Sequence, residues 1–282
     1  MVEVAPFKRQ LLKWVGSKAR VAHRIIAHFP DGFATYHEPF LGSGAVLAAL
    51  RPTRARASDL FAPLIEIFTA LSRDPEVVKG WYGERLAYFQ SGPAPERYAD
   101  IRARYNAAPN GADFLFLSRA CYGGVVRFRR KDGAMSTPLG AHPLMPLARF
   151  SDRVDLWAGR LRGTTFAACD YRDAMARAAP GDLVYCDPPY ATSQSILYGA
   201  QAFQLPELFG AIAACKARGV RVALSIDGAK KSGRRDCAPA VPAGLFARTV
   251  TLDLGGSMLR RFQMEGGQMD GEEVSDRLML SW

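Results

Sequence analysis

The apolar positions of the chain form short runs that alternate with longer amphipathic segments. The runs predict buried strands, and the segments, whose apolar residues recur at helical spacing, predict helices. The predicted strands are Ala55–Asp59, Thr165–Cys169, Leu183–Cys186 and Val220–Ile226, together with a strand that ends at Thr35–Phe40. The predicted helices are Ala45–Leu50, Pro63–Leu71 and Leu205–Arg218, the last followed by Gly219 where a C-terminal cap belongs. This alternation indicates an α/β domain built on a parallel sheet.

Two departures from the alternation define the expected organisation. Phe246–Leu254 and Val274–Trp282 are consecutive predicted strands, so the doubly wound, mostly parallel sheet should end in an antiparallel C-terminal strand. Between residues 74 and 166 the pattern changes to helices and loops, with a break at Ser91–Pro95. We therefore expect a mainly helical insertion at 74–166 between two halves of the α/β domain, residues 1–73 and 167–282.

The composition is that of a folded protein with an excess of basic residues. Of the 282 residues, 49% are apolar and 23% are charged, which excludes a wholly disordered chain. The five cysteines include no Cys-x-x-Cys pair and predict free thiols in a reducing compartment. No apolar run approaches the roughly 20 residues of a membrane span, and the start does not resemble a secretory signal. The formal net charge of +10 favours a polyanionic partner, nucleic acid before an anionic membrane surface.

A glycine-rich turn follows the first predicted strand, in the sequence Glu38-Pro39-Phe40-Leu41-Gly42-Ser43-Gly44. Glycines at a strand-to-helix turn let the backbone approach a ligand, although the motif is partial and a merely tight turn is the alternative. Asp59 ends the next strand, where an acid can accept hydrogen bonds from ribose hydroxyls or, alternatively, cap the following helix. The turn and the acid together predict a cofactor that contains adenosine.

The sequence Asp187-Pro188-Pro189-Tyr190 directly follows a buried predicted strand. The two prolines remove two backbone donors and end the strand, so the Asp187 carboxylate and the Pro188 carbonyl become acceptors at the carboxyl edge of the sheet. Two acceptors and an aromatic ring suit the exocyclic amine of a base, because acceptors that bind both N–H groups free the nitrogen lone pair for attack. A plain proline turn with a surface tyrosine is the alternative.

These two motifs resemble those of S-adenosylmethionine-dependent amino-methyltransferases. The wider sequence is similar to the Dam-like, alpha-class DNA adenine N6-methyltransferases. The segments that carry this similarity are Leu12–Lys18, Phe114–Arg119 leading to Tyr122–Gly124 and Arg127-Phe128, and Ser136–Gly140. The resemblance covers nearly the whole chain in the family's order of cofactor motifs, recognition insertion and catalytic motif. Ser17, Ser118 and Gly123 depart from the residues that are usual in the family.

The resemblance implies a Rossmann-like methyltransferase sheet with S-adenosylmethionine as the methyl donor. The residues implied to bind it are Trp14, Lys18, Glu38, Phe40, Gly42, Ser43, Gly44, Asp59, Asp170, Tyr171 and Asp187. The implied catalytic residues are Asp187, Pro188, Pro189 and Tyr190, with Tyr190 stacking on the target base. We expect no metal site, because His23 and His28 lack acid or cysteine partners at metal spacing. His37 and Cys186 are expected to be core residues.

Double-stranded DNA is the substrate that the resemblance implies. Tyr122 matches a residue that wedges into the duplex, and Arg127 matches one that reads guanine, the commonest specific contact of arginine in the major groove. The implied phosphate contacts are Arg129, Arg130, Lys131, Arg260 and Arg261. A solvated loop is the alternative both for Arg129–Lys131 and for the basic segment Gly255–Gly267.

The function implied is methyl transfer to N6 of a flipped adenine by direct attack, without a covalent enzyme intermediate. The alternatives are methylation of cytosine N4, of adenine in RNA or of a protein glutamine, and a non-catalytic DNA-binding protein on the same scaffold. We expect a prokaryotic, cytoplasmic, DNA-associated enzyme, and the resemblance is compatible with a monomer and with an accompanying restriction endonuclease. The basic residues should form a rim, near Arg127–Lys131 and Arg260-Arg261, around an acidic pocket.

Overall fold

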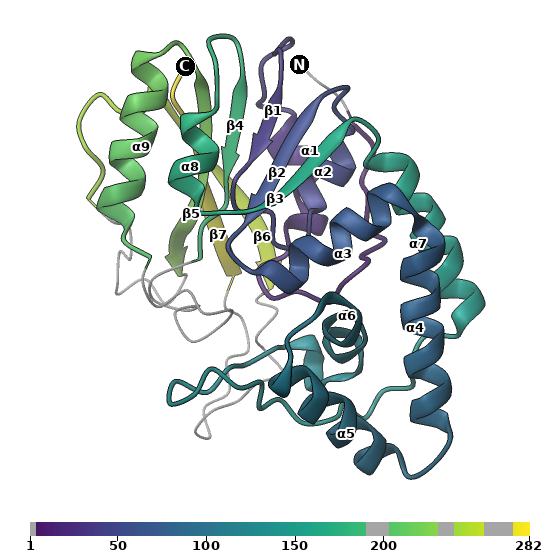
Figure 1. The fold of residues 1–282 in the computed structure, drawn as a ribbon. Coiled ribbons are helices and arrows are strands. Elements are labelled where there is room, and N and C mark those ends of the chain that lie inside the picture. Colours follow the sequence, from purple (N-terminus) through teal and green to yellow (C-terminus); the bar gives the residue numbers. More distant parts are fainter. Residues whose placement is uncertain (1–3, 190–202, 231–239, 257–272) are drawn as a thin grey trace.

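A seven-stranded sheet organises the chain in the computed structural model, which describes residues 4–189, 203–230, 240–256 and 273–282 (Figure 1). The strands are β1 (Tyr36–Glu38), β2 (Ala55–Asp59), β3 (Thr164–Ala168), β4 (Leu183–Cys186), β5 (Arg221–Lys230), β6 (Arg248–Gly256) and β7 (Glu273–Leu280). Their order is β3-β2-β1-β4-β5-β7-β6. β7 pairs antiparallel with β5 and β6, whereas the other neighbours are parallel. The predicted fold class, with its antiparallel C-terminal strand, is confirmed.

Helices cover both faces of this sheet. They are α1 (Ala22–Ile26), α2 (Ala45–Leu50), α3 (Ala62–Arg73), α8 (Tyr171–Ala176) and α9 (Leu205–Ala217), with a short 3-10 helix η1 (Lys18–Arg20) at the start. In Figure 1, α8 and α9 lie on the near face and α1 and α2 on the far face. Strand β4 packs into both layers: Leu183 and Tyr185 join one apolar core, and Val184 and Cys186 join the other. Its continuous apolar run in the sequence follows from this burial on two sides.

A helical insertion lies between α3 and β3. It contains α4 (Pro75–Gln90), α5 (Ala94–Ala107), α6 (Gly111–Ala120), the 3-10 helix η2 (Tyr122–Gly124) and α7 (Leu147–Arg160). The predicted insertion, 74–166, extends three residues too far, because Thr164, Thr165 and Phe166 belong to β3 and pair with β2. Among the described helices, none is long and apolar enough to cross a membrane.

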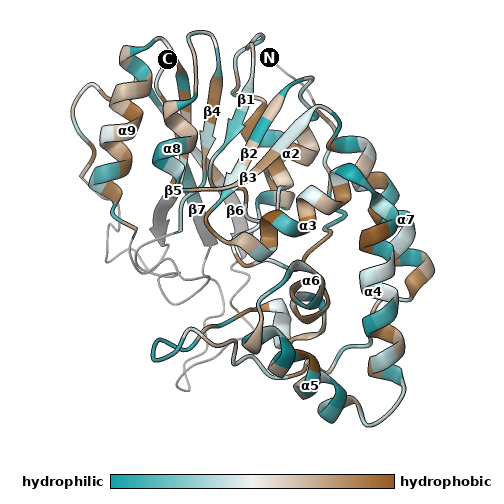
Figure 2. Cartoon of the chain, viewed as in Figure 1, coloured by the Kyte–Doolittle hydropathy of each residue, from teal (hydrophilic) through white to brown (hydrophobic). Residues whose placement is uncertain are grey.

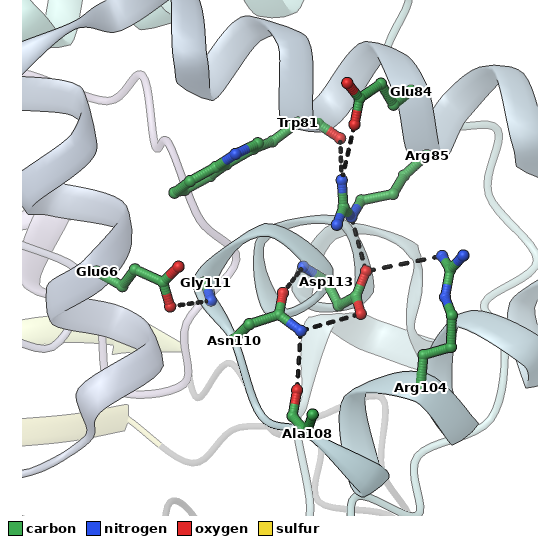
Figure 3. Close-up of polar contacts among 9 residues, drawn as sticks. All are labelled: Glu66, Trp81, Glu84, Arg85, Arg104, Ala108, Asn110, Gly111 and Asp113. Carbon is green, nitrogen blue, oxygen red and sulfur yellow. Dashed lines mark hydrogen bonds and ion pairs between the residues drawn. The ribbon is translucent and has the colours of Figure 1, made fainter.

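Polar contacts hold helix α6 to its neighbours within the insertion and to α3 of the α/β domain (Figure 3). Asp113 on α6 accepts a hydrogen bond from Arg85 Nε on α4 at 2.7 Å. Asn110 caps α6 by accepting from Asp113 N at 2.8 Å. Gly111 N donates to Glu66 Oε2 on α3 at 2.6 Å. Helix α6 therefore packs directly on α3, and the insertion shares one apolar core with the first half of the α/β domain.

Candidate active site

The glycine-rich turn and the Asp187 turn meet at the carboxyl ends of the central strands β1 and β4. Residues of both turns line one pocket together with residues of the N-terminal segment. They include Trp14, Lys18, Glu38, Phe40, Gly42, Ser43, Tyr185, Asp187 and Pro188. Of these, only Tyr185 was not singled out from the sequence. The strand order explains the convergence, because β1 and β4 are neighbours although about 150 residues separate them in the chain.

Contacts within the protein shape the glycine-rich turn. Gly42 has a φ of +48°, and a Cβ at this position would lie 3.0 Å from Trp14 Nε1. Gly42 N donates to Asp59 Oδ2, and Phe61 N donates to Asp59 Oδ1, each at 3.0 Å. Asp59 thus joins the turn to the start of α3, which is close to the capping alternative, and it remains partly exposed at the end of β2.

The N-terminal segment is attached to the same turn. Ser17 Oγ lies 2.8 Å from Ser43 Oγ, so the serine that departs from the family's usual glycine makes a contact of its own. The Trp14 ring lies 6.5 Å from the Phe61 ring and 6.2 Å from the Phe114 ring, measured between centroids. Because Phe114 belongs to α6, one aromatic cluster connects the pocket to the insertion.

Lys18 lies between two carboxylates. Its Nζ is 3.0 Å from Asp187 Oδ1 and 3.1 Å from Asp276 Oδ2. Burial alone would lower the pKa of Lys18. The two nearby carboxylates have the larger combined effect and raise the pKa, so Lys18 stays protonated. Asp276 lies on β7 and was not predicted as a site residue. Its position between Ser275 and Arg277 in a predicted strand does not distinguish it from an acid on the surface, so the sequence offered no signal for it.

Glu38 is almost fully buried at the end of β1. Tyr36 Oη donates to Glu38 Oε2 at 2.7 Å. Burial raises the pKa of Glu38 to about 8, the hydrogen bond from Tyr36 opposes this shift, and the negative charge of Asp187 adds to it. Near neutral pH the group is therefore mostly protonated, and a cationic ligand beside it would favour its ionised form.

An aromatic pair and an exposed leucine lie just beyond the carboxyl ends of the parallel strands, and of these residues Phe40 lines the pocket. Phe40 stacks on Tyr171 with 5.0 Å between ring centroids and an interplanar angle of 27°. Asp170 does not line the pocket; it caps α8 by accepting from Arg172 N at 2.8 Å. Leu60, which the sequence analysis also missed, is 73% exposed directly after Asp59. The sequence feature that could have identified Leu60 is an apolar residue directly after the acid that ends a strand.

The insertion carries a basic hairpin, residues 121–140, between α6 and α7. Two antiparallel bridges, Cys121 with Leu139 and Phe128 with Met135, connect its arms. Figure 2 shows hydrophilic residues at its tip. Its exposed residues include five of the seven for which a DNA contact was expected, namely Tyr122, Arg127, Arg129, Arg130 and Lys131. Arg129 also forms an ion pair with Asp132 at 2.7 Å.

Helix α5 and the N-terminal segment hold this hairpin. Tyr98 Oη donates to Thr137 O at 2.8 Å. The Asn106 side chain accepts from Met135 N at 2.8 Å and donates to Met135 O at 3.1 Å. Gly124 has a φ of +68°, and a Cβ there would lie 2.6 Å from the Cβ of Lys13. The segment that lines the pocket therefore also packs against the start of the hairpin.

The remaining residues singled out from the sequence are placed as follows. His37 Nε2 lies 2.9 Å from Asp182 Oδ2, and both His37 and Cys186 are buried, as predicted. Pro189 is partly buried after β4. Tyr190, Arg260 and Arg261 lie outside the described residues, as does most of Gly255–Gly267. In the described part of the chain, no group of three or more His, Cys, Asp or Glu side chains could hold a metal ion.

The sequence model of the D12 class N6 adenine-specific DNA methyltransferases matches residues 14–226, which run from the N-terminal segment to β5. The chain belongs to this family. It is therefore a methyltransferase that acts on adenine in DNA, and its reaction requires a methyl donor.

Relatives of this methyltransferase support the assignment. The DNA adenine methylase of Vibrio cholerae serotype O1 is 27% identical over 236 residues, which cover 77% of this chain and 81% of the relative. The DNA adenine methylase of Serratia marcescens is 29% identical over 210 residues, 71% of this chain and 74% of the relative. The DNA N-6-adenine-methyltransferase of Escherichia phage P1 is 28% identical over 241 residues, 80% of this chain and 30% of that longer protein.

Proposed function

We propose that the methyltransferase transfers the methyl group of S-adenosylmethionine to N6 of an adenine that is flipped out of double-stranded DNA. One observation carries the proposal: Asp187 and Pro188, which can bind an amine, line the same pocket as the glycine-rich turn. An acceptor site for the amine and a site for the donor are thus side by side.

The pocket residues fit the chemistry of this donor. Glu38 and Asp187 are acids that suit its sulfonium and ammonium groups, and Lys18 suits its carboxylate. Asp59, at the end of β2, is placed to accept hydrogen bonds from ribose hydroxyls, and the exposed Leu60 offers an apolar surface to adenine. When bound, the donor supplies an electrophilic methyl group.

Asp187 and the Pro188 carbonyl would activate the target amine. The N6 lone pair of adenine is delocalised into the ring, and acceptors for both N–H groups favour a pyramidal nitrogen whose lone pair can attack. Tyr190 follows two residues later and would hold the base by stacking. The base must leave the helix first, because the amine is out of reach inside the stack.

The hairpin would position the duplex over this pocket. Tyr122 would wedge into the base stack, Arg127 would read guanine, and Arg129, Arg130 and Lys131 would contact phosphates. Support comes from their exposure on one hairpin, which packs through Gly124 against Lys13 of the pocket's own N-terminal segment.

Identification of the product tests the proposal. The protein is incubated with methyl-labelled S-adenosylmethionine and duplex DNA, the DNA is digested, and the nucleosides are separated. We expect the label in N6-methyl-2′-deoxyadenosine. The single-stranded form of the same DNA is the matched control. Label in N4-methylcytosine, or in RNA rather than duplex DNA in a parallel reaction, would overturn the proposed substrate.

A further inference from the structure

Three segments that are distant in the sequence meet at the Lys18 ammonium. Lys18 belongs to the N-terminal segment, Asp187 to the turn after β4, and Asp276 to β7. The side chains of Lys18 and Asp276 are only 7% and 2% exposed, and that of Asp187 is 19% exposed. Buried ionic groups contribute little net stability compared with well-packed apolar residues of similar size. The cluster therefore calls for a functional explanation.

The charges in the cluster are unequal. Two carboxylates surround one ammonium, so the three groups together carry one negative charge. If Asp187 were the sole anionic partner of Lys18, the ammonium would neutralise Asp187 and weaken it as an acceptor for an amine. Asp276 shares the ammonium, and its position on a strand of the sheet fixes where the lysine side chain ends.

We propose that Asp276 is a positioning residue for methyl transfer, which holds Lys18 and shares its charge so that Asp187 remains oriented and anionic toward the target amine. The inference rests on the proposed role of Asp187. Asp276 does not line the pocket, so its effect on the reaction passes through Lys18.

A double-mutant cycle tests this role. The turnover number kcat and the KM values for donor and duplex DNA are measured for Asp276→Asn, Asp276→Glu, Lys18→Met and Lys18→Met/Asp276→Asn. We expect Asp276→Asn to lower kcat by roughly 10- to 100-fold through misplacement of the acceptor, with KM values changed less than about threefold. Asp276→Glu should restore most of the loss. The double variant should be no slower than Lys18→Met, because Asp276 acts through the lysine.

Three results would overturn the inference: a wild-type kcat in Asp276→Asn, independent losses that multiply in the double variant, or a Glu variant no better than the Asn variant. Asp182→Asn is the matched control, since it also removes a buried carboxylate charge, beside His37 and away from the pocket lining. It should lower thermal stability and leave kcat unchanged at temperatures where it is folded. If Asp276→Asn does not fold, Asp276→Ser, which leaves room for water, replaces it with the same expected results.

The proposed function can fail separately from this inference. Normal methylation by Asp276→Asn combined with loss of methylation in Asp187→Ala would overturn only the role of Asp276. Normal methylation by Asp187→Ala would overturn the proposed mechanism itself.

Discussion

Glu38 should make the stability of the protein fall as the pH rises. Burial raises its pKa to about 8 in the folded protein, whereas the group has its ordinary value of 4.5 in an exposed chain. The folded state therefore binds the extra proton between these values, and the contribution of Glu38 to stability is complete below about pH 4.5 and is lost toward pH 8. Urea denaturation of the wild type between pH 5 and 8 should show a steeper fall in the free energy of unfolding than Glu38→Gln shows.

Glutamine is a matched replacement, because its amide oxygen can still accept the hydrogen bond from Tyr36. Parallel pH profiles of the free energy of unfolding for the two proteins would show that Glu38 is already ionised in the folded state.

Single residues differ in how far the sequence could identify them. Asp187 was predictable, because its two prolines dictate a turn at the strand end and leave the carboxylate as an acceptor. Asp276 was not, because its relation to Lys18 exists only once β7 is inserted between β5 and β6. Asp170 was assigned to the cofactor by resemblance, but in the structure its side chain contacts Arg172 at the start of α8.

The elements of the insertion depend on the Asp113 carboxylate. Asp113→Ala should lower the free energy of unfolding by about 3 kcal/mol, because it removes a buried partner of Arg85. Glu84 is the matched control: it lies 3.4 Å from the same arginine but is 75% exposed. Glu84→Ala should change the free energy by less than about 0.5 kcal/mol. Equal losses in urea denaturation would show that burial does not set the strength of these contacts.

Two substitutions on the hairpin distinguish recognition of the DNA sequence from binding to DNA phosphates. Arg127→Ala should reduce the discrimination between the recognised DNA sequence and single-base variants by about 1–3 kcal/mol. Arg130→Ala should weaken the binding of all DNA sequences alike. It should also reduce the slope of log affinity against log salt concentration by about one, which corresponds to one fewer released counterion. Both are measured as DNA affinities across a salt series. A uniform loss in Arg127→Ala would make Arg127 a phosphate contact instead.

Elements with a plain apolar pattern were predictable at residue resolution. The bounds of α2, β2 and β4 coincide with those predicted, because each is set by a local feature: a glycine turn, a terminal acid or a proline pair. The docking of the hairpin on α5 was not predictable. It depends on Tyr98 and Asn106 bonding to backbone groups some 30 to 40 residues away, and such partners leave no periodic signal.

At the scale of the whole molecule, the acids Glu38, Asp187 and Asp276 lie at or beside the pocket. The hairpin exposes Arg127, Arg129, Arg130 and Lys131, but other exposed basic residues, including Arg51, Arg54 and Arg56, lie elsewhere on the surface, so the expected basic rim is not distinct there. The net charge of +10 suggested a polyanionic partner, and it could not indicate where that partner would bind. The packing of Gly124 against Lys13 connects the two regions, so a duplex on the hairpin would be placed relative to the pocket.

The most direct test of the proposed role of Asp187 is the rate of methyl transfer to duplex DNA by Asp187→Ala, compared with the wild type at saturating donor and DNA. Loss of the carboxylate that holds the target amine should reduce this rate by about 100- to 1000-fold, while the variant remains folded and still binds DNA. Methyl transfer by Asp187→Ala at the wild-type rate would show that Asp187 does not activate the target amine.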